Sequence, residues 1–155
     1  MKLSMYDAAG PVSIRAMNNL AVILEKAAAH AEARKVDPAV LIQDRLFPDM
    51  FPLVRQVQIA CDTAKYGPAR LAGAEAPAYE DNETTFAELI ARVRKTAAYV
   101  ETLPKAAFEG AEERTVTWQA RGKSRSMQGL HYLFNHVLPN IYFHVTTAYA
   151  ILRHN

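Results

Sequence analysis

The sequence contains a single cysteine, Cys61, among its 155 residues. One thiol cannot form an internal disulfide, and it cannot supply the paired cysteines of a structural zinc site. Cys61 lies on an apolar stripe with no base beside it, so we expect a packed, unreactive thiol. The composition therefore excludes a disulfide scaffold and a cysteine-rich metal domain.

Long apolar runs and an excess of one charge are also absent. No stretch approaches the roughly 20 apolar residues of a membrane span, and the first ten residues lack the apolar core of a signal peptide. Eighteen Lys and Arg face sixteen Asp and Glu, so the net charge is only +2 and gives no electrostatic case for nucleic-acid binding. We therefore expect a cytoplasmic protein with neither a membrane nor a nucleic-acid partner.

The common catalytic motifs are missing as well. There is no glycine-rich phosphate loop, no Cys-x-x-Cys, no Gly-x-Ser-x-Gly and no His-Glu-x-x-His. Basic side chains cluster between residues 114 and 125, but two glutamates precede them, which favours a solvated turn over a phosphate site. The basic residues of this turn are Arg114, Arg121, Lys123 and Arg125.

What is present is enough apolar sequence for one domain over residues 1–155, with 50% hydrophobic and 22% charged residues. Residues 4–35 carry apolar side chains at three- and four-residue steps, which predicts a helix with one buried stripe. Pro11 lacks a backbone donor, so we expect the regular part to start or kink there, with the segment around Tyr6 separate. Asp37 and Pro38 then predict the cap and first position of a short helix through Leu46.

Two further long helices follow from the same spacing. One begins at Pro48 and either ends by Gly67 and Pro68 or continues brokenly to Gly73. Residues 74–83 form a connecting loop, and the capping-box spacing of Thr85 and Glu88 starts the next helix, which runs to about Leu103.

The last third of the chain changes character and then returns to helix. Two short strands around a glycine-containing turn are expected within residues 105–128. An apolar stripe resumes over residues 130–153, where Pro139 must kink or locally open the helix. The predicted fold is all-α, an antiparallel four-helix bundle with a small β-hairpin insertion before the last helix.

His144 is the strongest candidate for chemistry, because it lies on the apolar stripe of the last helix. Asn140 lies four residues earlier and His136 eight earlier, so the three residues share one face. A neutral imidazole can ligate a metal or act as a base, but a single histidine on an apolar face is also commonly a hydrogen-bonded core residue. Both interpretations stand at this point.

Other polar residues flank the predicted core. Gln56 and Gln58 border the stripe of the second long helix, where each either faces the interior or is an ordinary boundary residue. Asn18, beside Met17, is the more inward of two neighbouring asparagines in the first helix. Tyr6 either packs or covers one end of the bundle.

Several segments of the chain resemble a known group of proteins. Residues 138–153, LPNIYFHVTTAYAILR, look like the last helix of the DinB/YfiT-like superfamily of four-helix metalloenzymes. Residues 48–52, 56–62 and 80–86 resemble one bacterial branch of it, known as domain of unknown function 1993. The resemblance covers nearly the whole chain and implies a DinB-like bundle, and because superfamily members are often dimeric it also implies a homodimer.

The resemblance further implies which residues would replace a metal centre. Metal-binding members usually present one His from the second helix and a His-x-x-x-His pair from the last. His144 matches the second His of that pair, whereas Asn140 stands in place of the first and Gln56 in place of the helix-two His. Carboxamides are weak donors to zinc or nickel, so we expect no metal site and no cofactor. A divalent Zn or Ni ion is the alternative.

Two functions follow from these residues. The first is a metal-independent protein that binds a small molecule in a polar pocket between the helices. The alternative is a divalent-metal-dependent transferase or hydrolase similar to the thiol-dependent S-transferases of the superfamily, with His144 holding the metal or acting as base. The expected pocket residues are Gln56, Asn140, His144, Asn18 and Tyr6.

Overall fold

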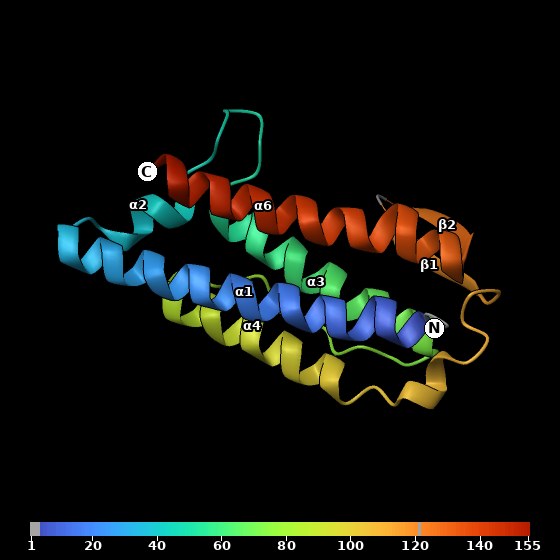
Figure 1. The fold of residues 1–155 in the computed structure, drawn as a ribbon. Coiled ribbons are helices and arrows are strands. Elements are labelled where there is room, and N and C mark those ends of the chain that lie inside the picture. Colours follow the sequence, from blue (N-terminus) through green and yellow to red (C-terminus); the bar gives the residue numbers. More distant parts are fainter. Residues whose placement is uncertain (1–3, 121) are drawn as a thin grey trace.

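The structure is a computed structural model that describes residues 4–120 and 122–155. Its four long helices lie side by side and form a bundle (Figure 1). In chain order the described elements are α1 (Met5–Arg34), α2 (Pro38–Gln43), α3 (Leu53–Ala72), α4 (Phe86–Glu101), the 3₁₀ turn η1 (Lys105–Phe108), β1 (Thr115–Ala120), β2 (Lys123–Gln128), α5 (Gly129–Tyr132), the π-helical turn η2 (Leu133–Val137) and α6 (Leu138–His154).

Neighbouring helices of the bundle are antiparallel in some pairs and parallel in others. Helix α1 packs mainly along α4, and α3 packs mainly along α6; each of these pairs is antiparallel, as Figure 1 shows. By contrast α3 and α4 run parallel, because residues 73–85 return along the bundle between them. The 20-residue α3 is about 30 Å long, and 13 extended residues can span up to about 45 Å, so this return is sterically easy. The predicted helical bundle is confirmed.

Helix α1 begins earlier than expected. The Ser4 side chain accepts a hydrogen bond from the backbone N–H of Asp7 and caps a helix that starts at Met5 and contains Pro11. The expected start at Pro11 and the separate segment around Tyr6 are therefore wrong. Pro11 removes only one helical hydrogen bond in the second turn, while the cap and the buried Met5 stabilise the first turn.

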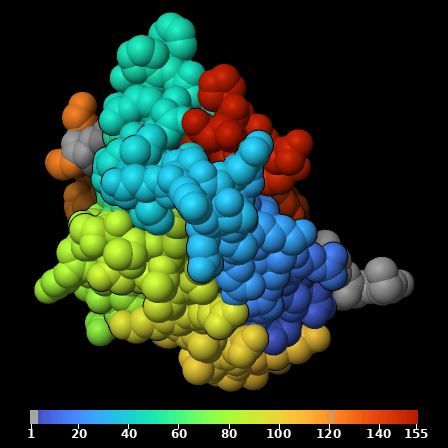
Figure 2. Space-filling model, turned by 90° about the vertical axis from the view of Figure 1, so that its left-hand side faces the viewer, coloured from blue at the N-terminus to red at the C-terminus, as the bar shows by residue number. Residues whose placement is uncertain are grey.

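The segment between α2 and α3 also differs from expectation. Asp37 and Pro38 start α2 as predicted, but α2 ends at Gln43 rather than at Leu46, and α3 starts at Leu53 rather than at Pro48. The intervening residues 44–52 project from the bundle and stand at the top of the end-on view (Figure 1, Figure 2). The guanidinium of Arg45 donates to the backbone carbonyls of Pro48 and Met50, which replaces helical hydrogen bonds there.

Helix α3 continues through Gly67 and Pro68 without a break, so the later of the two expected ends is confirmed and the expected break is wrong. Gly73 caps the helix with a φ of 68°, in the left-handed region. Close packing explains the glycine inside the helix. A Cβ atom on Gly67 would lie 2.5 Å from Cγ1 of Val137 in η2. Only glycine lets the two backbones approach this closely.

Helix α4 has the predicted capping box of Thr85 and Glu88, and it ends two residues before Leu103. The predicted hairpin is confirmed too, with β1 and β2 paired antiparallel from Thr115↔Gln128 to Ala120↔Lys123. Trp118 of β1 is buried against Tyr132 of α5, which attaches the hairpin to the bundle.

The basic turn is only partly solvated. Lys123 and Arg125 are exposed as expected, and Arg121 lies outside the described residues. The expectation is wrong for Arg114, which is half-buried and donates hydrogen bonds to the backbone carbonyls of Leu71 and Ala107. Leu71 lies in the last turn of α3, where carbonyls lack helical partners, and an arginine can satisfy them.

The final helical segment opens before Pro139, as predicted. The π-helical turn η2 lies between α5 and α6, and Pro139 follows it in the first turn of α6. Proline supplies no N–H to the carbonyl one turn back, and a π-helical turn accommodates the change in hydrogen bonding. No helix in the described part of the chain is long and apolar enough to cross a membrane.

Candidate functional site

His144 and Gln56 form a buried polar pair between α6 and α3. The two helices are antiparallel neighbours, so Gln56, the fourth residue of α3, and His144, the seventh residue of α6, meet across their interface. Nδ1 of His144 lies 2.6 Å from Oε1 of Gln56. The residues are 8% and 1% exposed, so the hydrogen bond is largely shielded from water. The interpretation of Gln56 as an ordinary boundary residue is therefore wrong.

A second hydrogen bond fixes the direction of the first. Nε2 of Gln56 donates to the backbone carbonyl of Phe51 at 3.1 Å. Because a carbonyl oxygen can only accept, the Gln56 amide nitrogen points to Phe51 and its oxygen points to His144. The imidazole must then carry its proton on Nδ1, and this leaves the lone pair on Nε2.

The surroundings keep the His144 imidazole neutral. Burial lowers the pKa of His144 below its ordinary value, and the nearby Arg55 guanidinium lowers that pKa further. Among the described residues, the side-chain polar atoms that are both sealed from solvent and unpartnered belong to Ser13, Tyr79 and Arg92. Nε2 of His144 is not one of them, so it is a base that still reaches solvent.

The other expected pocket residues lie elsewhere. Asn140 is half-buried one helical turn from His144, but its side chain donates to the backbone carbonyl of His136 at 2.6 Å. Asn18 is exposed, so the expectation that it faces inward is wrong. Tyr6, in the first turn of α1, packs edge-on against Phe108 of η1, 5.4 Å between ring centroids, and not against the pair.

His136 belongs to an aromatic cluster rather than to this pair. Its ring lies 4.9 Å from that of Trp118 and 5.3 Å from that of Tyr132. Burial lowers the pKa of His136, and the charges of Arg70 and Arg125 lower it further. This cluster anchors the β-hairpin.

The residues at the His144 pair do not fit a zinc or nickel centre. Zinc is normally held by three or four imidazole, thiolate or carboxylate ligands. At this pair His144 is the one such ligand. The oxygen and the nitrogen of the Gln56 carboxamide are both already hydrogen-bonded, and the Asn140 carboxamide donates to a backbone carbonyl of its own helical segment. Within residues 4–120 and 122–155, no three His, Cys, Asp or Glu side chains come close enough to hold a metal ion.

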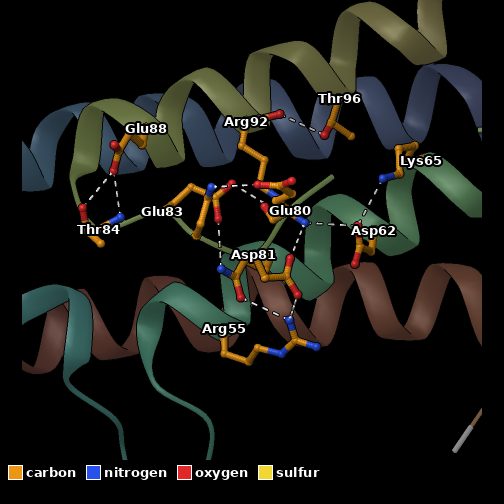
Figure 3. A network of polar contacts seen from close by, with 12 residues as sticks. Arg55, Asp62, Lys65, Glu80, Asp81, Glu83, Thr84, Glu88, Arg92 and Thr96 are labelled. Carbon is orange, nitrogen blue, oxygen red and sulfur yellow. Dashed lines mark hydrogen bonds and ion pairs between the residues drawn. The ribbon is translucent and has the colours of Figure 1, made fainter. Parts of the chain in front are cut away.

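A charged network lies on the opposite side of α3, facing α4 (Figure 3). Its centre is Arg92 of α4, whose side chain is only 3% exposed. The guanidinium donates to Asp62 at 3.2 Å, to Asp81 at 2.8 Å and to Glu83 at 2.9 Å, and also to the backbone carbonyl of Glu80. Although burial alone would lower it, the pKa of Arg92 is raised, because Glu83 and Asp62 stabilise its charge.

The same network reaches the residues next to Gln56. Arg55 pairs with Asp81 and donates to Oε1 of Gln58, whose amide nitrogen donates to Glu83 at 2.9 Å. These contacts fix the loop 73–85 against α3, which is what a parallel α3 and α4 require. The spacing of apolar residues did not predict the network; the available signal was the acidic run at residues 80–83 together with Arg92 beside the stripe residue Val93.

Two further buried groups adjoin the network. The Lys65 side chain is fully buried; its Nζ lies 3.3 Å from Asp62 and 3.6 Å from the Tyr79 ring centroid, and burial lowers its pKa. Burial raises the pKa of the Cys61 thiol to about 12. The expectation of a packed, unreactive Cys61 is therefore confirmed.

Comparison with known proteins agrees with this architecture. A crystal structure described as a DinB family member protein from Shewanella denitrificans is 45% identical in sequence and superposes with a TM-score of 0.90, covering 97% of this chain and 85% of that chain. No curated protein matches the chain. The model of a domain of unknown function, DUF1993, matches residues 5–155, which include the segments whose resemblance was noted. The chain therefore belongs to the DUF1993 family.

Proposed function

We propose that this protein binds a small organic molecule at His144 without a metal ion. The observation that carries the proposal is the 2.6 Å contact between Nδ1 of His144 and Oε1 of Gln56. This contact orients the ring and presents the Nε2 lone pair as a fixed hydrogen-bond acceptor. A ligand with one hydrogen-bond donor would satisfy that acceptor.

The surrounding residues favour an apolar or aromatic body on this ligand. The rings of Phe51 and Phe143 are both 55% exposed, and both residues belong to the site. Phe51 accepts the Gln56 hydrogen bond through its carbonyl, and the Phe143 ring centroid lies 5.1 Å from that of His144. A polar atom beside an exposed aromatic ring, here that of Phe143, is typical of sites for small ligands with an apolar body.

Phenol and anisole are a matched pair of probes for this proposal, because only phenol can donate a hydrogen bond. The ¹⁵N resonance of His144 Nε2 should shift and saturate with phenol and should stay in place with anisole. His144→Leu should abolish phenol binding, while Phe134→Leu, which removes an exposed ring of η2, should preserve it. Equal binding of the two probes, or phenol binding that survives His144→Leu, would contradict the proposal.

Metal independence is tested separately. Untagged protein should contain far less than about one equivalent of zinc or nickel, and a chelator should leave its Tm unchanged. Near-stoichiometric metal with a chelator-dependent loss of Tm would favour the transferase or hydrolase alternative instead.

The expected homodimer also remains a prediction. Light scattering at micromolar concentration measures it directly, and a monomeric mass would contradict it.

A further inference from the structure

A groove of about 530 Å³ opens between α1 and α6, away from the His144 pair. These two helices run parallel and pack mainly on other partners, α4 and α3, so they diverge enough to leave space between them. Helix α2 borders the groove, and in the end-on view α2, α1 and the last turns of α6 adjoin one another (Figure 2). The volume lies within the range of about 300–1,000 Å³ typical of small-molecule sites.

The lining of the groove is mostly apolar. Val22, Ile23 and Ala27 contribute from α1, and Leu41 of α2 and Leu152 of α6 complete the apolar surface. Ala27 and Leu41 are buried, whereas Val22 is 48% exposed, so the apolar surface extends from the core to the opening. Such a surface favours an alkyl chain or a ring, because covering it removes apolar area from water.

The charges at the groove are positive. Lys26 and Arg153 line it from opposite helices, and His30 adds nitrogen atoms one turn beyond Lys26. No aspartate or glutamate is among the described residues that line it.

Two acidic residues near the groove have their own partners, and one of these partners, Asn155, lines the groove. Glu25 pairs with Arg94 of α4, and the carboxylate of Asp44 accepts a hydrogen bond from the side chain of Asn155. The two cations of the groove therefore have no acidic side chain among the groove residues to neutralise them, which favours an anionic ligand.

We propose that this groove binds an amphiphilic carboxylate, with its apolar chain against Leu41, Ala27 and Leu152 and its carboxylate between Lys26 and Arg153. An arginine can hold a carboxylate through two parallel hydrogen bonds, and a lysine adds a point charge. This site is distinct from the His144 pair, and its failure would leave the proposal for that pair unaffected.

Three ten-carbon probes separate charge from apolar burial: decanoate, decanol and decyltrimethylammonium, each used below its micelle concentration in calorimetric titrations. Decanoate should bind at least tenfold more tightly than the other two. Binding of decanoate should weaken at least tenfold in Lys26→Gln/Arg153→Gln and should be unchanged in Lys123→Gln, which removes an exposed charge at the hairpin.

A second variant tests the location without altering charge. Val22→Trp adds bulk at an exposed edge of the groove. It should lower the affinity for decanoate at least tenfold while the Tm stays close to that of the wild type. His144→Leu should leave decanoate binding unchanged. Equal affinity for decanoate and decyltrimethylammonium, or wild-type decanoate binding in the Lys26→Gln/Arg153→Gln variant, would overturn the proposal.

Discussion

Helix α3 presents two contrasting polar regions on its two sides. Toward α6 it places one neutral carboxamide, Gln56, against one neutral imidazole, His144. Toward α4 it contributes to a network in which Arg92 meets three carboxylates. The network holds a loop in place, and the unpartnered Nε of Arg92 is sealed from solvent, whereas Nε2 of His144 remains available to solvent. A polar group that is oriented but not fully used is the better candidate for function.

The largest expected effect comes from breaking the charged region. Arg92→Met should lower the free energy of unfolding by about 3 kcal/mol, because three carboxylates lose their shared cation. The effect falls at the lower end of the range for buried pairs, since Asp62 and Asp81 are about one-third exposed. Urea unfolding measures it.

The matched control is Arg94→Ala, which removes a pair with Glu25 that is 65% and 39% exposed. It should cost about 1 kcal/mol or less. If both variants lost the same small amount, the Arg92 network would be no more than a surface ion pair.

The neutral pair should show a smaller but coupled effect. Gln56→Leu leaves the Nδ1 proton of His144 without a partner and should cost about 1–3 kcal/mol. Combining it with His144→Leu should cost less than the sum of the single variants, because no buried polar atom of the pair is then left unmatched. Additive losses in the double-mutant cycle would show that the two side chains do not depend on one another.

Packing between α3 and the last helical segment is tested at Gly67. Gly67→Ala should cost about 1–2 kcal/mol, because a clash with Val137 outweighs the better helix propensity of alanine. Adding Val137→Ala should recover part of the loss, and chemical denaturation of the four proteins measures this coupling. Wild-type stability of the single variant would mean that the helices can separate freely at this point.

The smallest expected effect is on pH dependence. His144 has a folded-state pKa below the ordinary value of 6.5, so below that pH the unfolded chain binds more protons than the folded one. The stability that it contributes is complete above pH 6.5 and is lost as the pH falls from there through its folded-state pKa. The titration of this one group changes the free energy of unfolding by at most about 1.4 kcal/mol per pH unit.

Between pH 5 and 8, the free energy of unfolding should therefore fall less steeply with decreasing pH in His144→Gln than in the wild type. His131→Gln, which removes an exposed histidine, should keep the wild-type slope. Identical slopes in all three proteins would contradict the burial of a neutral imidazole at position 144.

The sequence predicted the bundle because its determinants are local. Apolar spacing, the Asp37 and Thr85 caps and the strands of the hairpin each depend on residues a few positions apart, and all are present. The expected boundaries failed at Pro11 and Pro48. There, the effect of a proline depends on whether buried neighbours and a cap stabilise the turn, and spacing does not show that.

The site was predicted in part for a related reason. His144 and Gln56 were expected from their positions, and their 2.6 Å contact joins residues 88 positions apart in the chain. Asn18 and Asn140 had suitable positions too, but a helical residue near a boundary can turn to solvent or to its own backbone, as each of these does.

By itself the sequence determined which segments are helical, which faces are apolar and which polar residues could lie inside, because these properties repeat within a single helix. Tertiary structure decided that α3 and α4 run parallel, that Arg92 collects carboxylates from α3 and the returning loop, and that α1 and α6 leave a groove between them. Each of these features depends on which helix faces meet, and that is set by the packing of the whole core.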